Sequence, residues 1–315
     1  MTVLKDQYPW IKEPLVINAP MADNAGCLLA ATVTLAGGFG LIGSKVDMNI
    51  TKRELSMAKE IFASMQHAQS ETLPLGVGFL PFILKLEPAL EVVKEFKPAV
   101  VWLFAAKEFD DYAVWAKAVR EVSPKSQVGH GFEKGAGIIS LLPETADALE
   151  AAGYRLPLLA SGGIMDGRGV AAAVSLGAAG VVMGTRFLAS KEALVHPIVQ
   201  ASIVEAKDGG QVTTRSKLFD QLRGPNIWPE MYDGRSLVIK SHKEYVEGAS
   251  LEEIQKKHNE ALKEEGMGWK TGLEGRAAIW AGTGVGLAKG VQGASDIVRK
   301  VRDDARRRLT QAAKF

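Results

Sequence analysis

The chain has 315 residues, more than a typical domain, but large α/β barrels fold as one unit at this length. Hydrophobic residues make up 47% and charged residues 23%, an ordinary globular composition that excludes wholesale disorder. The net charge of +2 gives no global field for nucleic acid or an anionic membrane, and the single cysteine excludes a disulfide framework and a Cys-rich metal site. The N-terminus lacks the apolar core of a signal peptide and no apolar run reaches the ~18 residues of a membrane span, so we expect a soluble, cytoplasmic protein.

Six short apolar runs in the first two hundred residues do not alternate with polar residues, a pattern typical of parallel strands buried on both faces. They cover 15–20, 40–42, 74–79, 99–104, 156–161 and 180–184. The segments between them predict helices. One is opened by a capping box of Thr51 and Glu54, and a later one is capped by Asp166. This alternation leaves two candidates, a (β/α)8 barrel and a doubly wound open sheet.

The spacing of the strands favours a barrel that is incomplete. No GxGxxG follows the first strand, and the Gly-rich turns come after the last two strands, where barrels commonly bind phosphate. Four of the five gaps between strand starts average about 27 residues, whereas the gap from 99 to 156 is 57. That gap holds two βα units where a complete barrel needs three, and 126–129 is the one candidate for the extra strand. We therefore predict an α/β fold of the TIM-type (β/α)8 class with about seven countable strands.

Residues 205–275 differ from the rest, because they contain Gly- and Pro-rich stretches and a charged helix opened by a capping box of Ser250 and Glu253. We interpret this segment as a helical lid, and residues 1–204 together with 276–315 as the barrel that binds any cofactor. The last forty residues carry a net charge of +6. No aromatic platform or nucleic-acid motif accompanies that charge, so we interpret the tail as a solvated terminal helix and expect no nucleic-acid partner.

The most specific stretch is 157–187, where glycines follow two successive strands. Gly162 and Gly163 precede a helix, and Met183-Gly184-Thr185 repeats the arrangement one strand later. Backbone N–H groups at such turns hold the phosphate of a cofactor or substrate in many barrel enzymes. Two well-capped turns without a ligand remain the alternative at this point.

Two further segments bring candidate residues to the same end of the barrel. Pro20 cannot continue a central ladder, so the first strand ends there and Ala19 and Met21 reach the open end. His130 lies among four glycines in GHGFEKGAG, and an imidazole titrates near neutral pH as a general base must. A structural or merely exposed histidine is the alternative. No His/Cys cluster or HExxH occurs, so we predict no metal site.

On these residues the chain resembles the nitronate monooxygenase (2-nitropropane dioxygenase-like) family of FMN-dependent barrel enzymes, most of all its fungal branch. The resemblance rests on APM at 19–21, GHG at 129–131, LLPE at 141–144, ASGGIMDGRG at 160–169 and MGTRF at 183–187. It implies oxidation of alkyl nitronates, and of nitroalkanes, by O2 to a carbonyl compound and nitrite, with His130 as catalytic base. It also implies that FMN is surrounded by Ala19, Pro20, Met21, Gly129, Ser161, Gly162, Gly163, Met183, Gly184 and Thr185.

The segment before the histidine departs from the family pattern. Relatives reach it through a strand with Gln-Gly and then Ala-Gly-Gly-His, whereas Gln127-Val128 leads directly into Gly129-His130 here. The lost length agrees with the independent strand count. Two alternatives therefore stay open: an enoyl-reductase-like flavoprotein that uses NAD(P)H, and a truncated, inactive isoform that binds FMN weakly. We expect a small-molecule substrate and O2 as partners, no membrane, and allow for a homodimer.

Overall fold

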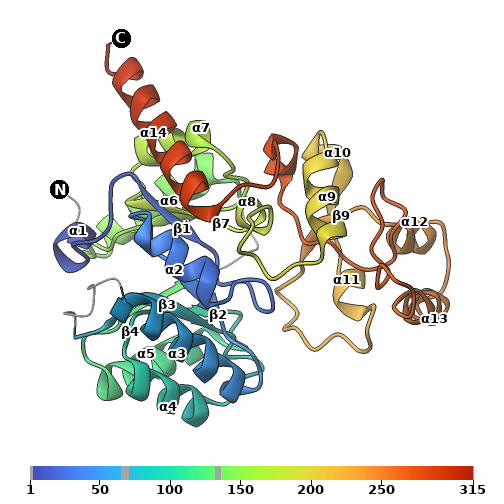
Figure 1. The fold of residues 1–315 in the computed structure, drawn as a ribbon, viewed down its shortest axis with the longest axis horizontal. Helices are drawn as coiled ribbons and strands as arrows, with labels where there is room; N and C mark the ends of the chain where they lie inside the picture. The colour runs from blue at the N-terminus through green and yellow to red at the C-terminus, as the bar shows by residue number, and fades with distance from the viewer. Residues whose placement is uncertain (1–2, 65–70, 132–135, 315) are drawn as a thin grey trace. The chain divides into compact units, whose positions relative to one another are not determined.

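The computed structural model describes residues 3–64, 71–131 and 136–314, without the side chains of residues 3 and 128–131. The chain divides into two compact units (Figure 1). The first comprises 1–194 and 292–315, and the second comprises 195–291. The second unit begins ten residues earlier and ends sixteen residues later than the expected lid of 205–275, whose role as a lid stays a prediction. No helix in the described ranges is both long and apolar enough to cross a lipid bilayer.

In its described residues the first unit has seven parallel strands, as many as the spacing predicts. They form the sheets β6-β7-β1 and β2-β3-β4-β5, which a parallel bridge between Ile17 and Phe39 connects. From β6 through β7 and β1 to β5, neighbours in sequence are thus neighbours in space, which is the order of a barrel and not of a doubly wound sheet. The strands are β1 (Leu15–Asn18), β2 (Leu41–Gly43), β3 (Leu73–Phe79), β4 (Pro98–Phe104), β5 (Gln127–Gly131), β6 (Leu159–Ser161) and β7 (Gly180–Met183).

The barrel order is interrupted between β5 and β6, which do not pair with each other within the described residues. From the sequence alone we predict that the opening lies beside the fourth strand, and that residues 126–129 take the place of a full strand. The opening instead lies beyond β5, because Gln127–Gly131 forms a five-residue strand in register with β4. The Ser126 hydroxyl donates to the Pro98 carbonyl at 2.5 Å and fixes the start of that strand.

On the other side of the opening, β6 is shorter than expected. It begins at Leu159, and Leu156 and Pro157, which the sequence places in the strand, are exposed and irregular. A strand with a neighbour on one side makes only half of its ladder hydrogen bonds, so its end has little to hold it extended.

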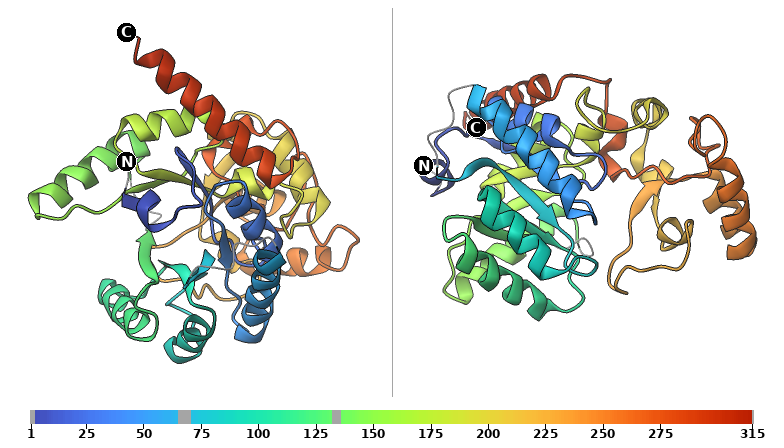
Figure 2. Two further views of the ribbon diagram at one scale, coloured as in Figure 1. Left: turned by 60° about the vertical axis from the view of Figure 1, so that its left-hand side comes forward. Right: turned by 60° about the horizontal axis from the view of Figure 1, so that its bottom comes forward.

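Helices cover the outer face of the strands, in the order that a βα repeat produces (Figures 1 and 2). One core lies between β2–β4 and the helices α2 to α5, and another lies between β1, β6 and β7 and the helices α2, α7 and α14. The interior is filled from the strands by residues such as Leu15, Ile17, Leu41 and Val182. The helices are α1 (Val3–Gln7), α2 (Cys27–Leu35), α3 (Met48–Ser64), α4 (Leu86–Phe96), α5 (Phe109–Val122), α6 (Ile138–Ala151), α7 (Gly167–Ser175), α8 (Thr185–Leu188) and α14 (Ala294–Ala312).

The structure confirms one of the helix caps predicted for the first unit and contradicts the other. Asp166 caps α7 as expected, since its carboxylate accepts the Arg168 N–H at 2.9 Å. The capping box of Thr51 and Glu54 is wrong, because α3 already begins at Met48 and both residues lie within it. Their side chains serve neighbouring segments instead: Thr51 accepts the Lys45 N–H, and Glu54 accepts the N–H of Cys27 at the start of α2.

The second unit is a set of short elements around a two-stranded antiparallel sheet. Ser250 caps the charged helix as predicted, accepting the Glu253 N–H at 3.2 Å. The elements are α9 (Pro197–Glu205), α10 (Gly209–Val212), β8 (Thr213–Arg215), α11 (Leu218–Gln221), β9 (Arg235–Leu237), α12 (Lys240–Val246), α13 (Leu251–Ala261) and the 3-10 helix η1 (Thr283–Leu287).

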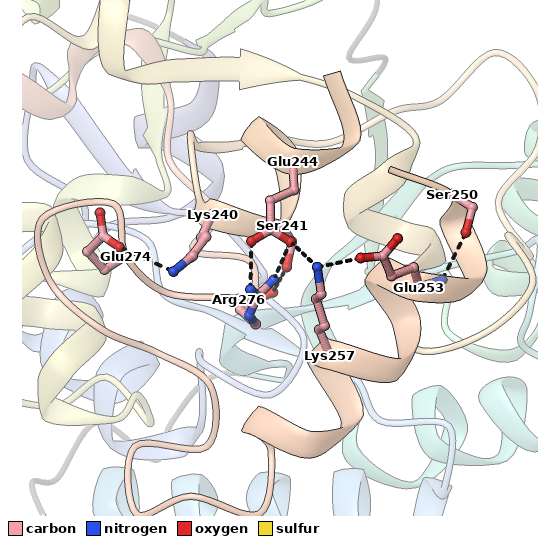
Figure 3. A network of polar contacts seen from close by, with 8 residues as sticks. All are labelled: Lys240, Ser241, Glu244, Ser250, Glu253, Lys257, Glu274 and Arg276. Atoms are coloured by element: carbon pink, nitrogen blue, oxygen red, sulfur yellow. Dashed lines mark hydrogen bonds and ion pairs between the residues drawn. The ribbon is translucent and has the colours of Figure 1, made fainter. Parts of the chain in front are cut away.

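An ion-pair network ties α12, α13 and the following loop together within the second unit (Figure 3). Glu244 accepts from Arg276 at 2.7 Å and from Lys257 at 3.1 Å, and Lys257 also pairs with Glu253. The hydrogen bond from Arg276, followed by that from Lys257, holds the pKa of Glu244 at about 2, although partial burial opposes the shift. The network therefore stays charged throughout the neutral range and acts as a structural clamp for this unit.

Candidate active site

The carboxyl end of β1 continues into a tight turn that crosses the end of the barrel. The Ala19 N–H donates to the Met183 carbonyl of β7 at 2.9 Å, and the Met21 N–H turns back to the Ala19 carbonyl at 2.9 Å. The strand itself ends at Asn18, so Pro20 stands outside the ladder as predicted. The buried side-chain amide of Asn18 donates to the Leu41 carbonyl at 2.7 Å and accepts the Leu41 N–H at 3.0 Å, which fastens β1 to β2 directly below the turn.

Two glycines that the sequence analysis does not single out make room for this turn. A Cβ at Gly43, the last residue of β2, would lie 2.4 Å from the Met21 carbonyl, and a Cβ at Gly78 in β3 would lie 2.4 Å from the Pro20 ring. Since β3 is not adjacent to β1, the segment must cross the end of β2 on the inner side of the strands. Glycines near the ends of two predicted strands are the signal that could have identified this contact.

Met21 also reaches the end of β7. A Cβ at Gly184 would lie 3.7 Å from the Met21 sulfur and 3.7 Å from the Ala19 Cβ, an ordinary contact distance. Ala19, Met21, Gly184 and Thr185 are partly exposed, so these predicted residues share one accessible region. Met183 differs, because its side chain is 1% exposed and packs in the core on the helix side; only its carbonyl faces the β1 turn.

The Gly-rich loop after β6 is open. Ser161, Gly162 and Gly163 are all exposed, and a Cβ at Gly162 would meet no atom within 4 Å. Both glycines have positive φ, +108° and +71°, which a residue with a side chain adopts only at a cost. In register, Ser161 stands beside Val182 of β7, so this loop and the Gly184 turn belong to adjacent strand ends.

The N-terminus of α7 does not contribute to an anion site in the way that the sequence suggests. Asp166 already caps it, and a Cβ at Gly167 would lie 2.6 Å from atoms of Asp304 in α14. An anion at the N-terminus of α7 would face the carboxylates of Asp166 and Asp304. The loop glycines before the helix remain the groups that are free of this repulsion.

Gly129 lies in a row of aligned positions that crosses four strands. The registers pair Gly43 with Gly78, Gly78 with Trp102, and Trp102 with Gly129. Residues paired across parallel strands share a face, so Gly129 is on the inner side, where the β1 turn crosses. His130 follows in β5 with its backbone paired to Leu103; its side chain lies outside the described part of the structure, and its role stays a prediction.

The structure gives no support for a thiolate nucleophile at Cys27 or for a metal site among the described residues. Burial, followed by the neighbouring Glu54, raises the pKa of the Cys27 thiol to about 12, so Cys27 is not a thiolate nucleophile at neutral pH. No group of three His, Cys, Asp or Glu residues that could hold a metal ion occurs in the described ranges.

Two cavities, of about 300 and 250 Å³, are lined entirely by residues of the second unit. Neither includes a predicted site residue. The candidate site therefore rests on the strand ends of the first unit and not on these cavities.

The crossing of the β1 turn gives a sharp test of the site. In Gly43→Ala, the added methyl collides with the backbone of Met21, and backbone cannot move aside as a flexible side chain would. We therefore expect the turn to shift and the affinity for flavin at the strand ends to fall by about tenfold or more. Gly210→Ala is the control, since Gly210 lies in the second unit, away from the proposed site residues, and its added methyl would meet the Asp208 carboxylate at an ordinary 3.5 Å. Flavin titration of both variants would measure the difference, and equal affinities would mean that the turn is not part of the site.

Comparisons with known proteins point to one family. A family model described as nitronate monooxygenase matches residues 125–302. The nitronate monooxygenase npaC of Metarhizium robertsii is 39% identical over an alignment that covers 98% of this chain and 95% of the relative. A nitronate monooxygenase of Neurospora crassa is 32% identical, with 100% of this chain and 95% of the relative covered.

Both alignments are longer than the part of this chain that they cover. The first spans 343 positions, and 98% of this chain is about 309 residues, so about 34 positions have no counterpart here. The second spans 368 positions, which leaves about 53 without a counterpart. The smaller shortfall is close to the length of one βα unit.

Solved structures share the architecture at low sequence identity. FabK from Thermotoga maritima has a TM-score of 0.73 at 22% identity, with 100% of this chain and 99% of that chain covered. A nitroalkane oxidase from Streptomyces ansochromogenes has a TM-score of 0.69 at 19% identity, with 99% and 100% covered. At these identities the likeness shows the fold alone.

Proposed function

Because the chain belongs to the nitronate monooxygenase family and is a flavin oxidoreductase, we propose that it oxidises alkyl nitronates, and nitroalkanes more slowly, with FMN and O2. The products are the carbonyl compound and nitrite. The observation that carries the proposal is the contact of the β1 turn with the end of β7, the strand beside the Gly-rich end of β6. There Met21 lies against Gly184, and Gly162 and Gly163 are open.

The residues at these strand ends fit a flavin mononucleotide. The open position at Gly162 and the positive φ of Gly162 and Gly163 let backbone come close to a phosphate without a side chain between them. Gly184 and Thr185 supply the second such turn on the adjacent strand. Ala19, Pro20 and Met21 would contact the ring system, and Gly129 and Ser161 would border it. Of Met183, only the backbone would take part.

The chemistry divides between the cofactor and the chain. A bound flavin supplies the electron transfer between nitronate and O2. His130 would take the α-proton of a neutral nitroalkane, or, as imidazolium, stabilise the negative charge of a nitronate. The turn glycines would hold the phosphate and so fix the position of the ring against Met21. The thioether is polarizable and apolar, which suits packing on an aromatic ring system.

Anaerobic reduction of the flavin tests the proposed function directly. Under nitrogen, an alkyl nitronate should bleach the oxidised flavin of the purified protein, whereas NADH and NADPH should not. Bleaching by the nicotinamides alone would identify the enoyl-reductase-like alternative instead. A protein that carries no flavin and does not bind added FMN would be the inactive isoform.

The phosphate site is tested by Gly163→Val. The valine fills the space that backbone and phosphate need for close approach, so FMN affinity should fall by about tenfold or more. Gly177→Val is a matched control, because Gly177 also has positive φ, at +97°, and an open Cβ position, but lies at the other end of α7. Titration of the apoprotein with FMN measures both. Equal affinities for the variants would place the phosphate elsewhere.

A further inference from the structure

Helix α6 lies beside the opening of the barrel, and nearly all of its residues are at least partly exposed to solvent. Of its fourteen residues, all of them described, Leu142 alone is buried. Ile139 is 67% exposed and Leu141 is 40% exposed, and in the connection to β6 Tyr154 and Leu156 are each 61% exposed. Scattered surface leucines are normal, but four large apolar side chains within eighteen residues, beside a free strand edge, mark an interaction surface.

The charge of this surface is of one sign. Residues 138–151 contain Glu144, Asp147 and Glu150 and no lysine or arginine. All three carboxylates are exposed, and none has an ion-pair partner among the residues that the structure describes. A partner that covers α6 should therefore present cations together with some apolar surface.

The end of α14 has the complementary charge. After Ala305, the helix leaves the body of the first unit, and its last turns are exposed apart from the half-buried Leu309 (Figure 1). Residues 306–314 contain Arg306, Arg307, Arg308 and Lys314 and no acidic residue. Arg307 and Arg308 both pair with Asp304 one turn earlier, so a single carboxylate is shared by two of these cations and the helix end keeps an excess of positive charge. The base of the helix is fixed, because the buried Arg302 donates to the carbonyls of Ala36 and Gly37 at 3.1 and 3.3 Å.

Both elements pack against the same neighbour. In the first unit, α7 contacts α6 and α14, so the acidic apolar helix and the basic helix end belong to one region of the surface. A two-fold axis beside α7 would lay the α14 end of each copy on α6 of the other, because an isologous interface makes each contact twice. One chain thus carries both halves of a self-complementary interface.

We propose that two copies of this chain associate through this surface, with residues 306–314 of each copy on α6 of the other. The association covers Ile139 and Leu141 with Leu309 and the aliphatic stems of the arginines. It also pairs the α6 carboxylates with the α14 cations. This explains how an apolar helix that its own unit leaves exposed persists in water.

Charge exchange tests the proposal by sedimentation velocity at several protein concentrations. One triple variant carries Glu144→Lys, Asp147→Lys and Glu150→Lys, and the other carries Arg306→Glu, Arg307→Glu and Arg308→Glu. The unaltered chain should have the mass of two chains of 33.8 kDa. Each triple variant alone should dissociate at least about tenfold more readily, since it brings like charges together. An equimolar mixture should regain the double mass, because both of its α6–α14 contacts then join opposite charges.

A second pair of variants tests the apolar part. Leu141→Glu should weaken the association, whereas Met57→Glu, on α3 and 52% exposed, should leave it unchanged. These readouts need neither flavin nor activity, so their failure is distinct from a failure of the proposed function. A single-chain mass at all concentrations, or a double mass that the triple variants retain, would overturn the proposal. Heterogeneous larger species that ignore these charges would do the same and would indicate pairing of strand edges.

Discussion

In the His130→Asn variant, oxidation of neutral nitroalkanes should fall by about 10²–10⁴-fold, the usual contribution of a positioned general base. Preformed nitronates have already lost the α-proton, so their oxidation should fall much less. The backbone of residue 130 is held in β5 by its register with Leu103, and asparagine leaves that pairing intact. Steady-state rates with matched pairs of nitroalkane and nitronate measure the difference.

Flavin content and a second histidine provide the controls for this variant. His196→Asn changes the same residue type in the second unit, where the His196 imidazole caps α9 by accepting the Ile198 N–H at 3.2 Å. Asparagine is itself a good N-cap, so this variant should fold and retain its activity. If His130→Asn lowers the rates on both substrates equally while flavin content stays constant, proton abstraction is not the role of this residue.

The strands of the barrel could be predicted well because each is buried on both faces, and such runs are uniformly apolar. The sequence placed β1, β2, β3, β4 and β7 within two residues of where they begin. It placed the start of β6 three residues too early, because the apolar residues 156–158 precede the strand. An apolar run becomes a strand only where a neighbour pairs with it, and the neighbour is what this chain lacks.

Helix starts were harder to predict, since a capping motif is a local pattern whose use depends on distant residues. Thr51 and Glu54 have the spacing of a capping box, yet Asp47 lies just before α3 and accepts the Asn49 N–H at 2.9 Å. Glu54 is thereby free to bond the N–H of Cys27 in another helix at 2.6 Å. Ser250 and Asp166 each accept an N–H in the first turn of the helix that they cap, so both predictions are confirmed.

The candidate site could likewise be predicted only in part. The motifs placed Met21, Gly162 and Gly184 at strand ends, because glycine and proline mark where a ladder stops. They did not reveal that Pro20 crosses to β3 or that Gly43 must lack a Cβ for the crossing. Those facts depend on the registers between β2, β3 and β4, which one-dimensional spacing does not contain.

Restoring about one βα unit between Val122 and Gly129, taken from a close relative, should raise both the melting temperature and the flavin occupancy. Because the strands of a barrel follow one another in chain order, the new strand would pair with β4, and β5 would move to the place between the new strand and β6. The new helix would then stand between α5 and α6 and cover part of the apolar surface of α6. Burying Ile139, Leu141 and Leu156, all exposed in the single chain, contributes about 1.5–3 kcal/mol each when complete. Part of that gain would raise the melting temperature by roughly 10 °C or more.

The gain in flavin occupancy has a geometric cause. Gly129 and His130 lie in β5 and Gly162 and Gly163 follow β6, so the two halves of the candidate site stand on opposite sides of the opening. Strand number, tilt and shear are linked in a barrel, and a displacement of ~1 Å between such halves can cost ~10²-fold in rate. An insertion of equal length made only of Gly and Ser is the matched control, because it lengthens the chain without supplying a strand. If the chain as it stands is as stable, as fully flavinated and as active as the restored one, then seven strands suffice and the opening has no functional consequence.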